Sequence, residues 1–167
     1  PATGSFILSP NHYSEIDPIA MGGAIWHLGR LPRFMAKASL FRVPVFGWLL
    51  KLSGQIPVQR EGAVRSSDGN PMGAAADLIR RQAAVIVYPE GTLTRDPDLW
   101  PMRGKTGAVR LALETGIPLI PAAHWGAQKL MPRYGKGIHP IPRKTIEVSV
   151  GEPLDLSKFT GREIDQK

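Results

Sequence analysis

The chain has 167 residues and no cysteine, and its 21 lysines and arginines against 14 acidic residues give a formal net charge of +7. This length favours one domain with a substantial hydrophobic core. The lack of cysteine excludes disulfides, thiolate metal sites and a cysteine acyl-enzyme. The excess of positive charge suits a polyanion, which can be nucleic acid, an anionic membrane surface or a phosphorylated substrate.

The first predicted elements are a strand at residues 6–8 and a helix at residues 18–28. Asp17 is a favoured N-cap residue, and Pro18 suits the first helical position. His12 therefore lies on the turn between the strand and the helix. If this turn curls back, Asp17 accepts a hydrogen bond from one ring nitrogen of His12, and the other nitrogen faces outward as a base. The alternative is that Asp17 serves only as a cap.

Residues 30–51 mix basic and aromatic side chains. Phe34, Ala38 and Phe41 fall on one face at helical spacing, with Lys37 beside them, and Pro44 divides the stretch in two. Basic residues interleaved with aromatics suit a membrane interface. The alternative is an ordinary amphipathic helix with its aromatic side chains in the core and its charges in water.

The middle of the chain contains the clearest buried strand, residues 83–88. It runs directly into Pro89, Glu90, Gly91 and Thr92, and α/β proteins place ligand sites where a strand meets a glycine loop. Successive backbone N–H groups in such a loop can hold an anion. Before it we expect a short strand at 56–58 that delivers Arg60 at its end, an exposed loop at 61–70 and a helix at 73–82.

The remaining elements follow in the same alternating order. We expect a loop at 96–101, a helix at 107–114 that ends at Gly116, a strand at 118–123, an irregular basic loop at 126–142, a strand at 146–150 and a polar tail from Asp155. Strands that alternate with helices predict an α/β fold, here a single domain over residues 1–167 with a central sheet flanked by helices.

Several other kinds of protein lack their signatures. The longest strongly apolar run, residues 43–50, is too short to span a bilayer, and no signal peptide is present. The four histidines show no metal-ligand spacing, no Gly-x-Ser-x-Gly elbow occurs, and no nucleic-acid-binding signature accompanies the charge. We therefore expect no metal and no nucleic acid. The chain starts at Pro1 without methionine, so we expect a missing N-terminal segment with room for a membrane anchor.

Four blocks in register resemble the glycerolipid acyltransferase family that includes 1-acylglycerol-3-phosphate O-acyltransferase. Residues 11–17 resemble its N-H-x4-D block, and residues 54–60 resemble G-x-I-x-x-x-R. Residues 88–94, Y-P-E-G-T-L-T, are similar to F-P-E-G-T-R-S, and residues 117–121, I-P-L-I-P, to V-P-I-V-P. Leu93 replaces the arginine of the third block, and Arg95 follows two positions later. The resemblance covers residues 5–155 and implies the corresponding acyltransferase fold.

The resemblance implies transfer of a fatty acyl group from acyl-CoA or acyl carrier protein to the free hydroxyl of 1-acylglycerol 3-phosphate, which makes phosphatidic acid. With no cysteine and no nucleophile elbow, a direct mechanism is expected: His12 acts as general base and Asp17 holds its tautomer. The thioester is a co-substrate, and no cofactor is expected.

The other candidate site residues bind substrate. Arg60 is expected to hold the acceptor phosphate, because its planar fork matches that group. Lys105 matches a family lysine and is expected to assist. Backbone N–H groups around Gly91 and Thr92 are expected to stabilise either an oxyanion or a phosphate. Glu90 either holds the loop by binding backbone N–H groups or contacts the acceptor's glycerol.

Alternatives remain open. The acceptor can be glycerol 3-phosphate or a glycosylated phospholipid. From other classes, the chain can be a lipid hydrolase that activates water with His12, or a non-catalytic membrane-binding domain, against which His12 and Asp17 argue. The expected partners are an acyl thioester, a lysophosphatidate-type acceptor and an anionic membrane surface. The expected location is the cytoplasmic face of the plasma membrane, peripheral or anchored.

Overall fold

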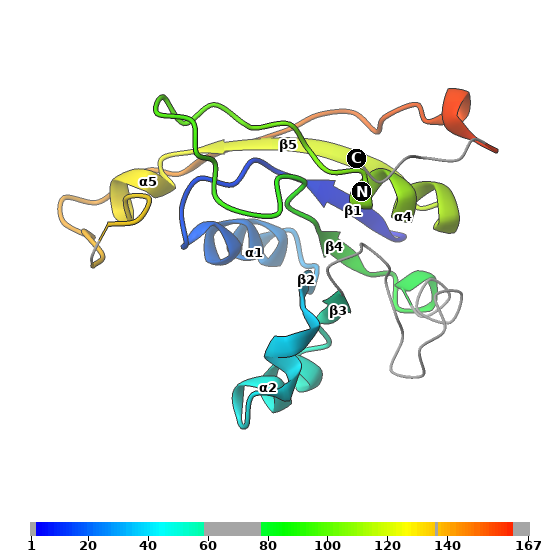
Figure 1. The fold of residues 1–167 in the computed structure, drawn as a ribbon, viewed down its shortest axis with the longest axis horizontal. Helices are drawn as coiled ribbons and strands as arrows, with labels where there is room; N and C mark the ends of the chain where they lie inside the picture. Colours follow the sequence, from blue (N-terminus) through cyan, green and yellow to red (C-terminus); the bar gives the residue numbers. More distant parts are fainter. Residues whose placement is uncertain (1–2, 59–77, 136, 162–167) are drawn as a thin grey trace.

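A six-stranded sheet with the order β3-β2-β4-β1-β5-β6 organises the chain. The computed structural model describes residues 3–58, 78–135 and 137–161 (Figure 1). The first five strands are parallel and β6 is antiparallel to β5. The strands are β1 (Phe6–Ser9), β2 (Pro32–Lys37), β3 (Ile56–Val58), β4 (Ala84–Ile86), β5 (Leu119–Trp125) and β6 (Glu147–Val150). The predicted α/β fold with one central sheet is confirmed.

Helices connect the strands and cover the sheet. They are α1 (Asp17–His27), α2 (Phe46–Leu52), α4 (Gly107–Thr115) and α5 (Ala127–Leu130), with 3-10 helices at Ala38–Arg42 and Ser157–Phe159. The predicted helix at 107–114 is confirmed, and Gly116 ends it with a φ of 69°, a left-handed conformation that glycine adopts without strain. The expected helix at 73–82 is described only from residue 78, and residues 78–80 are helical.

The hydrophobic core lies on both faces of the sheet. Successive strand side chains alternate between faces. One buried cluster therefore joins Ile7 of β1 and Val85 of β4 to Leu111 of α4. The opposite cluster joins Leu8 of β1 to Met21 of α1. Because β1 and β4 are buried on both sides, they read in the sequence as continuous apolar runs.

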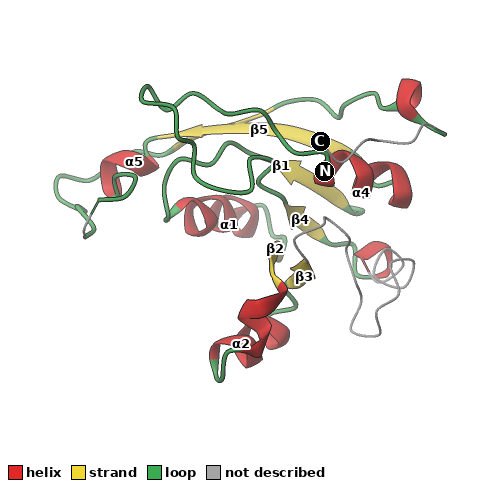
Figure 2. Cartoon of the chain, viewed as in Figure 1, coloured by secondary structure: helices red, strands yellow, loops and turns green. Residues whose placement is uncertain are grey.

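The connections that leave the neighbouring strands β1 and β4 lead to opposite sides of the sheet. From β1 it passes through α1 to β2 on one side, and from β4 it passes through α4 to β5 on the other. The two helices pack on opposite faces, so the loops that leave these neighbouring strands diverge. Open α/β sheets bind ligands at such a switch point, beyond the carboxyl ends of the strands. Figure 2 shows the long loops that run along the sheet beside β1 and β5.

The helix expected around Phe34, Ala38 and Phe41 is wrong for its first half, because residues 32–37 form β2 inside the sheet. This strand pairs with β3 on one side and β4 on the other, and Phe34 packs against the cluster around α1. Backbone pairing on two sides outweighs the helical spacing of three side chains. The expected basic loop at 126–142 also contains the short helix α5.

Candidate active site

His12 and Asp17 form a hydrogen-bonded pair at the carboxyl end of β1. The Nδ1 atom of His12 lies 3.0 Å from Oδ2 of Asp17, and the Asp17 side chain is fully buried while that of His12 is 17% exposed. Because an ionised carboxylate only accepts, Nδ1 carries the proton and Nε2 keeps its lone pair. The predicted closing of the turn is confirmed, and the geometry suits a general base.

Asp17 does not cap α1, so that part of the prediction is wrong. Ile16 occupies the capping position and no side chain caps the helix. The same Oδ2 atom instead accepts hydrogen bonds from the backbone N–H groups of Tyr13, at 2.7 Å, and Ser14, at 2.8 Å. These hydrogen bonds satisfy two backbone N–H groups of the turn before the helix. They also stabilise the buried charge that orients His12.

The peptide group between Asn11 and His12 is held by the loop that follows β4. The His12 N–H donates to Oε1 of Glu90 at 2.9 Å, and Oε2 of the same carboxylate accepts from the Met102 N–H at 3.0 Å. The His12 carbonyl accepts from the Thr94 N–H at 2.7 Å. Glu90 is buried and binds two backbone donors, as in the loop-holding alternative. Its contact with the acceptor stays a prediction.

Tyr88 supports one face of the His12 ring. The two rings stack with their centroids 4.2 Å apart and their planes inclined by 28°. Burial, and then the negative charge of Asp17, raise the pKa of the Tyr88 hydroxyl well above its ordinary value, so the phenol stays neutral. Tyr88 therefore acts on the site through its ring. Tyr88 stands where the resembling block has phenylalanine, so both residues offer an aromatic ring at this position.

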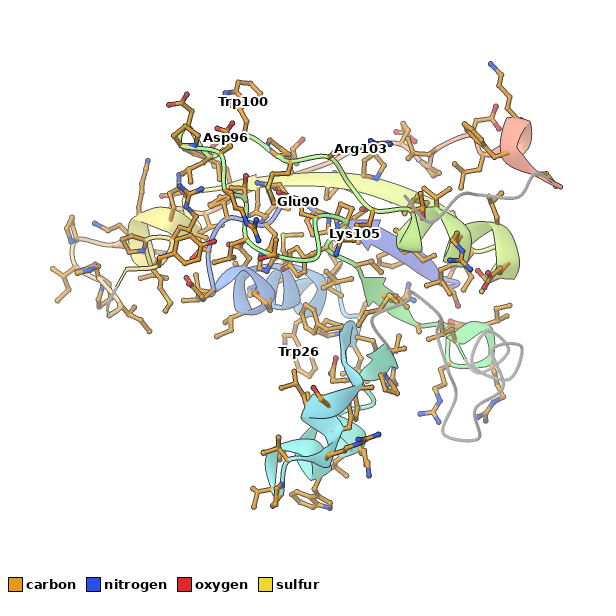
Figure 3. The ribbon with its side chains drawn as sticks, in the orientation of Figure 1. Trp26, Glu90, Asp96, Trp100, Arg103 and Lys105 are labelled. Carbon is orange, nitrogen blue, oxygen red and sulfur yellow. The ribbon has the colours of Figure 1, made fainter. Side chains whose placement is uncertain are left out.

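In the predicted anion-binding loop, one of the two candidate backbone N–H groups is already hydrogen-bonded within the turn. The Gly91 N–H donates to the Tyr88 carbonyl at 3.2 Å, with Gly91 at a φ of 68°. An anion cradle here therefore depends on the N–H of Thr92, which is exposed. Lys105 donates its N–H to the Pro89 carbonyl at 2.7 Å, and its Nζ lies 3.0 Å from the position that a Cβ atom on Gly91 would take (Figure 3). The lysine thus brings a cation to the loop, while its part in binding the acceptor stays a prediction.

Two further expectations, the role of Arg60 and the absence of a metal, are not tested by this geometry. Arg60 lies outside the described residues, although β3, which leads toward it, is present as expected. Within the described ranges, no group of three or more His, Cys, Asp or Glu residues is placed to hold a metal ion. The expectations of a cofactor-free and metal-free reaction stay predictions.

A cavity of about 760 Å³ lies beside residues that contact the backbone around His12. Its wall includes Asn11, Glu90 and His124, together with the exposed loop around Trp100. His12 itself is not part of the wall. The cavity therefore meets the backbone supports of the His12–Asp17 pair.

His124 is a buried residue of the site. In the sequence it is only one of four scattered histidines. It lies on β5, and its Nε2 is 3.0 Å from the Asn11 carbonyl oxygen. No local motif marks it, because 113 residues separate the two partners. The parallel pairing of β1 with β5 is the signal that brings them together.

The fold and the site define an α/β protein with a hydrogen-bonded histidine–carboxylate pair at the carboxyl end of a central strand. The family model described as Acyltransferase matches residues 1–125, and the chain belongs to this family.

Known relatives and a solved structure agree with this assignment. The chain is 30% identical over 148 residues to the chloroplastic 1-acyl-sn-glycerol-3-phosphate acyltransferase BAT2 of Brassica napus, covering 89% of this chain and 40% of that protein. It is 32% identical over 162 residues to the 1-acyl-sn-glycerol-3-phosphate acyltransferase of Bacillus subtilis, covering 95% and 71%. The chain thus spans less than half the length of the plant relative.

The fold is also similar to a crystal structure of the 1-acyl-sn-glycerophosphate (LPA) acyltransferase, PlsC, from Thermotoga maritima. The TM-score is 0.60 at 23% identity, over 97% of this chain and 60% of that one. This likeness supports the fold.

Glu90→Gln tests the loop-holding role of the carboxylate. A glutamine offers one oxygen and one NH2 group, so one of the two backbone donors is left unpaired, and we expect a loss of about 1–3 kcal/mol in unfolding free energy. Glu114→Gln, on the exposed part of α4, is the matched control and should change little. Urea unfolding measures both. A Glu90→Gln protein of unchanged stability with a raised acceptor KM would instead indicate direct substrate contact.

Proposed function

We propose that this protein transfers a fatty acyl group from acyl-CoA or acyl carrier protein to the free hydroxyl of 1-acylglycerol 3-phosphate. The observation that carries the proposal is the His12–Asp17 pair, with Nδ1 bound to a buried carboxylate and Nε2 left as a base. The names of the Brassica and Bacillus relatives support this acceptor.

In the proposed mechanism His12 Nε2 removes the proton of the acceptor hydroxyl while its oxygen attacks the thioester carbonyl carbon. Asp17 stabilises the imidazolium that forms. The tetrahedral intermediate collapses, the C–S bond breaks, and the proton held by His12 passes to the departing thiolate. The products are phosphatidic acid and a free thiol. No covalent acyl-enzyme is required, consistent with the absence of cysteine from the chain.

Positive charge is proposed to hold the acceptor phosphate beside this base. Arg60 follows β3, which is parallel to β2 in the same sheet and runs toward the same edge as β1. Lys105 already lies against Gly91 in the loop that follows β4. Lys105 would thus reach the acceptor from the β4 side of His12, and Arg60 is proposed to act together with it. The N–H of Thr92 is the remaining candidate for the oxyanion or for a phosphate oxygen.

The same protein is proposed to bind an anionic membrane surface through residues 38–52, here called the α2 arm. The arm extends away from the sheet (Figure 1). Val45, Trp48 and Leu52 are 72%, 61% and 69% exposed on it, and Arg42 and Lys51 are exposed beside them. Apolar side chains next to cations favour the interface of an anionic bilayer. Figure 3 shows Trp26 of α1 on the side of that helix that faces the arm.

None of the helices in the described part of the chain is long and apolar enough to span a bilayer. The proposed association rests on the α2 arm, and the proposed location is the cytoplasmic face of the plasma membrane.

His12→Ala should lower kcat by roughly 10²- to 10⁴-fold, the usual loss for a general base. His27→Ala, an exposed histidine at the end of α1, is the matched control and should keep its activity. Product analysis with labelled acyl-CoA and a panel of acceptors separates transfer from hydrolysis and 1-acylglycerol 3-phosphate from glycerol 3-phosphate or a glycosylated phospholipid. Near-normal turnover in His12→Ala would contradict the mechanism.

Arg60→Ala should lower kcat/KM for a phosphorylated acceptor by roughly 10- to 150-fold, because a hydrogen bond to a charged group contributes about 1.5–3 kcal/mol. Arg60→Lys should recover part of this loss, since it keeps the charge without the fork. The donor's KM should change far less. Arg143→Ala, at an exposed position, is the control. An effect mainly on the donor's KM would assign Arg60 to another site.

Reversing two charges on the α2 arm should weaken membrane binding. Arg30 and Arg33 are poor targets, because they donate to backbone carbonyls of Gly4 and Gly54. We therefore choose Arg42→Glu with Lys51→Glu. Binding to anionic vesicles should fall strongly, and added salt should weaken the wild-type binding. Arg143→Glu with Lys158→Glu makes the same change in net charge at exposed positions elsewhere. Co-sedimentation with anionic and neutral vesicles measures the effect, and equal losses in both pairs would contradict a specific role for the arm.

A further inference from the structure

His124 contacts the backbone next to the proposed base from the neighbouring strand. Its side chain is fully buried, and its Nε2 lies 3.0 Å from the Asn11 carbonyl oxygen. The Asn11 side chain returns the contact: Oδ1 accepts from the His124 backbone N–H at 2.9 Å, and Nδ2 donates to the His124 carbonyl at 3.2 Å. The two residues are thus joined by three hydrogen bonds between β5 and the chain that leaves β1.

The contact at the Asn11 carbonyl fixes one end of a particular peptide group. The other end of that group is the His12 N–H, which donates to Glu90 at 2.9 Å. The peptide plane before His12 is therefore held from the β5 side by His124 and from the β4 loop by Glu90. Because this plane sets the direction in which the His12 side chain leaves the backbone, both contacts orient the base.

The hydrogen bonds define the protonation of His124. A carbonyl oxygen only accepts, so Nε2 must carry a proton. Its Nδ1 is buried without a partner among the described residues. A buried acceptor tolerates such a place better than a buried N–H does. Burial lowers the pKa of His124 and so favours the neutral ring, although the nearby Asp17 carboxylate acts in the opposite direction.

Asp17 lies between two histidines that contact it differently. His12 Nδ1 is at hydrogen-bond distance from Oδ2, 3.0 Å, whereas His124 Nε2 is 3.8 Å from the same atom. The ring of His124 stacks on Tyr13, with centroids 4.8 Å apart, which holds it at that longer distance. The carboxylate therefore serves His12, and the Nε2–H group of His124 serves the Asn11 carbonyl.

We propose that His124 is a positioning residue for the His12 base, acting as a neutral Nε2–H donor that fixes the Asn11–His12 peptide. This inference rests on the proposed role of His12 as base. It assigns opposite tautomers to the two rings, with the proton on Nδ1 in His12 and on Nε2 in His124. It also predicts that a side chain at position 124 must donate a hydrogen bond, and that an imidazole as such is not required.

Two-bond ¹⁵N–¹H NMR on the unmodified protein tests the tautomers at about pH 7. We expect a neutral Nε2–H ring for His124 and an Nδ1–H ring for His12. The signals of His124 are assigned by their loss in the His124→Gln spectrum, and those of His12 by their loss in the His12→Ala spectrum. A protonated or Nδ1–H His124 would overturn the inference whatever the activity. This readout is independent of catalysis, so it separates this inference from the proposed function, which fails instead if His12→Ala retains turnover.

Kinetics with two substitutions test the donor. His124→Gln keeps an amide N–H that can reach the Asn11 carbonyl, and kcat should stay within about 3-fold of the wild type. His124→Leu removes the donor at similar volume, and kcat should fall roughly 10- to 100-fold with little change in either KM, as for a misplaced catalytic group. Ile117→Val, buried beside the amino end of β5, controls for general loss of stability and should keep kcat.

Equal losses in the Gln and Leu proteins, or none in the Leu protein, would overturn the donor role. If His124→Leu does not fold, the kcat of His124→Gln and the tautomer of the unmodified protein still decide: a large loss in the Gln protein contradicts the proposal, and retention together with the Nε2–H tautomer supports it.

Discussion

The site depends on one buried oxygen atom, Oδ2 of Asp17. A charged carboxylate without contact with water is costly unless donors compensate it, and here three donors meet the same oxygen: the His12 ring and the backbone N–H groups of Tyr13 and Ser14. The turn from β1 to α1 must close on itself for these contacts to form. One carboxylate oxygen therefore both orients the His12 ring and satisfies the backbone N–H groups of the turn, so neither contact can change without affecting the other.

A second set of contacts connects this turn to the strands beside it. Glu90 from the β4 loop and His124 from β5 hold the two ends of the peptide before His12, and Thr94 holds the carbonyl after it. His12 thus lies on a loop, but that loop is fixed from both neighbouring strands. Parallel pairing of β1 with β4 and β5 makes this possible, because it brings three carboxyl ends to one edge of the sheet.

What the sequence predicts well is what depends on near neighbours in the chain. The apolar run at 83–88, the helix that ends at Gly116 and the contact between His12 and Asp17, five positions apart, all follow from local chemistry. Helical spacing at residues 34–41 misleads, because β2 forms through pairing with strands far away in the chain. Asp17 shows a subtler limit: its chemistry identifies an acceptor for backbone N–H groups, but the same residue type serves donors before the helix as readily as donors within it.

His124 and Glu90 show why the supports of a site are harder to predict than its reacting group. Each contacts the backbone, which every residue has, so no residue pattern near His12 announces the partner. Their positions follow only from the strand order, in which β1 lies between β4 and β5. The same order makes the helices after β1 and β4 diverge to opposite faces, which leaves the ends of these strands uncovered by helix. The topology that leaves these strand ends open is therefore also the topology that supplies the two groups holding the peptide before His12, and a substitution in either support reaches the His12 ring through one shared peptide bond.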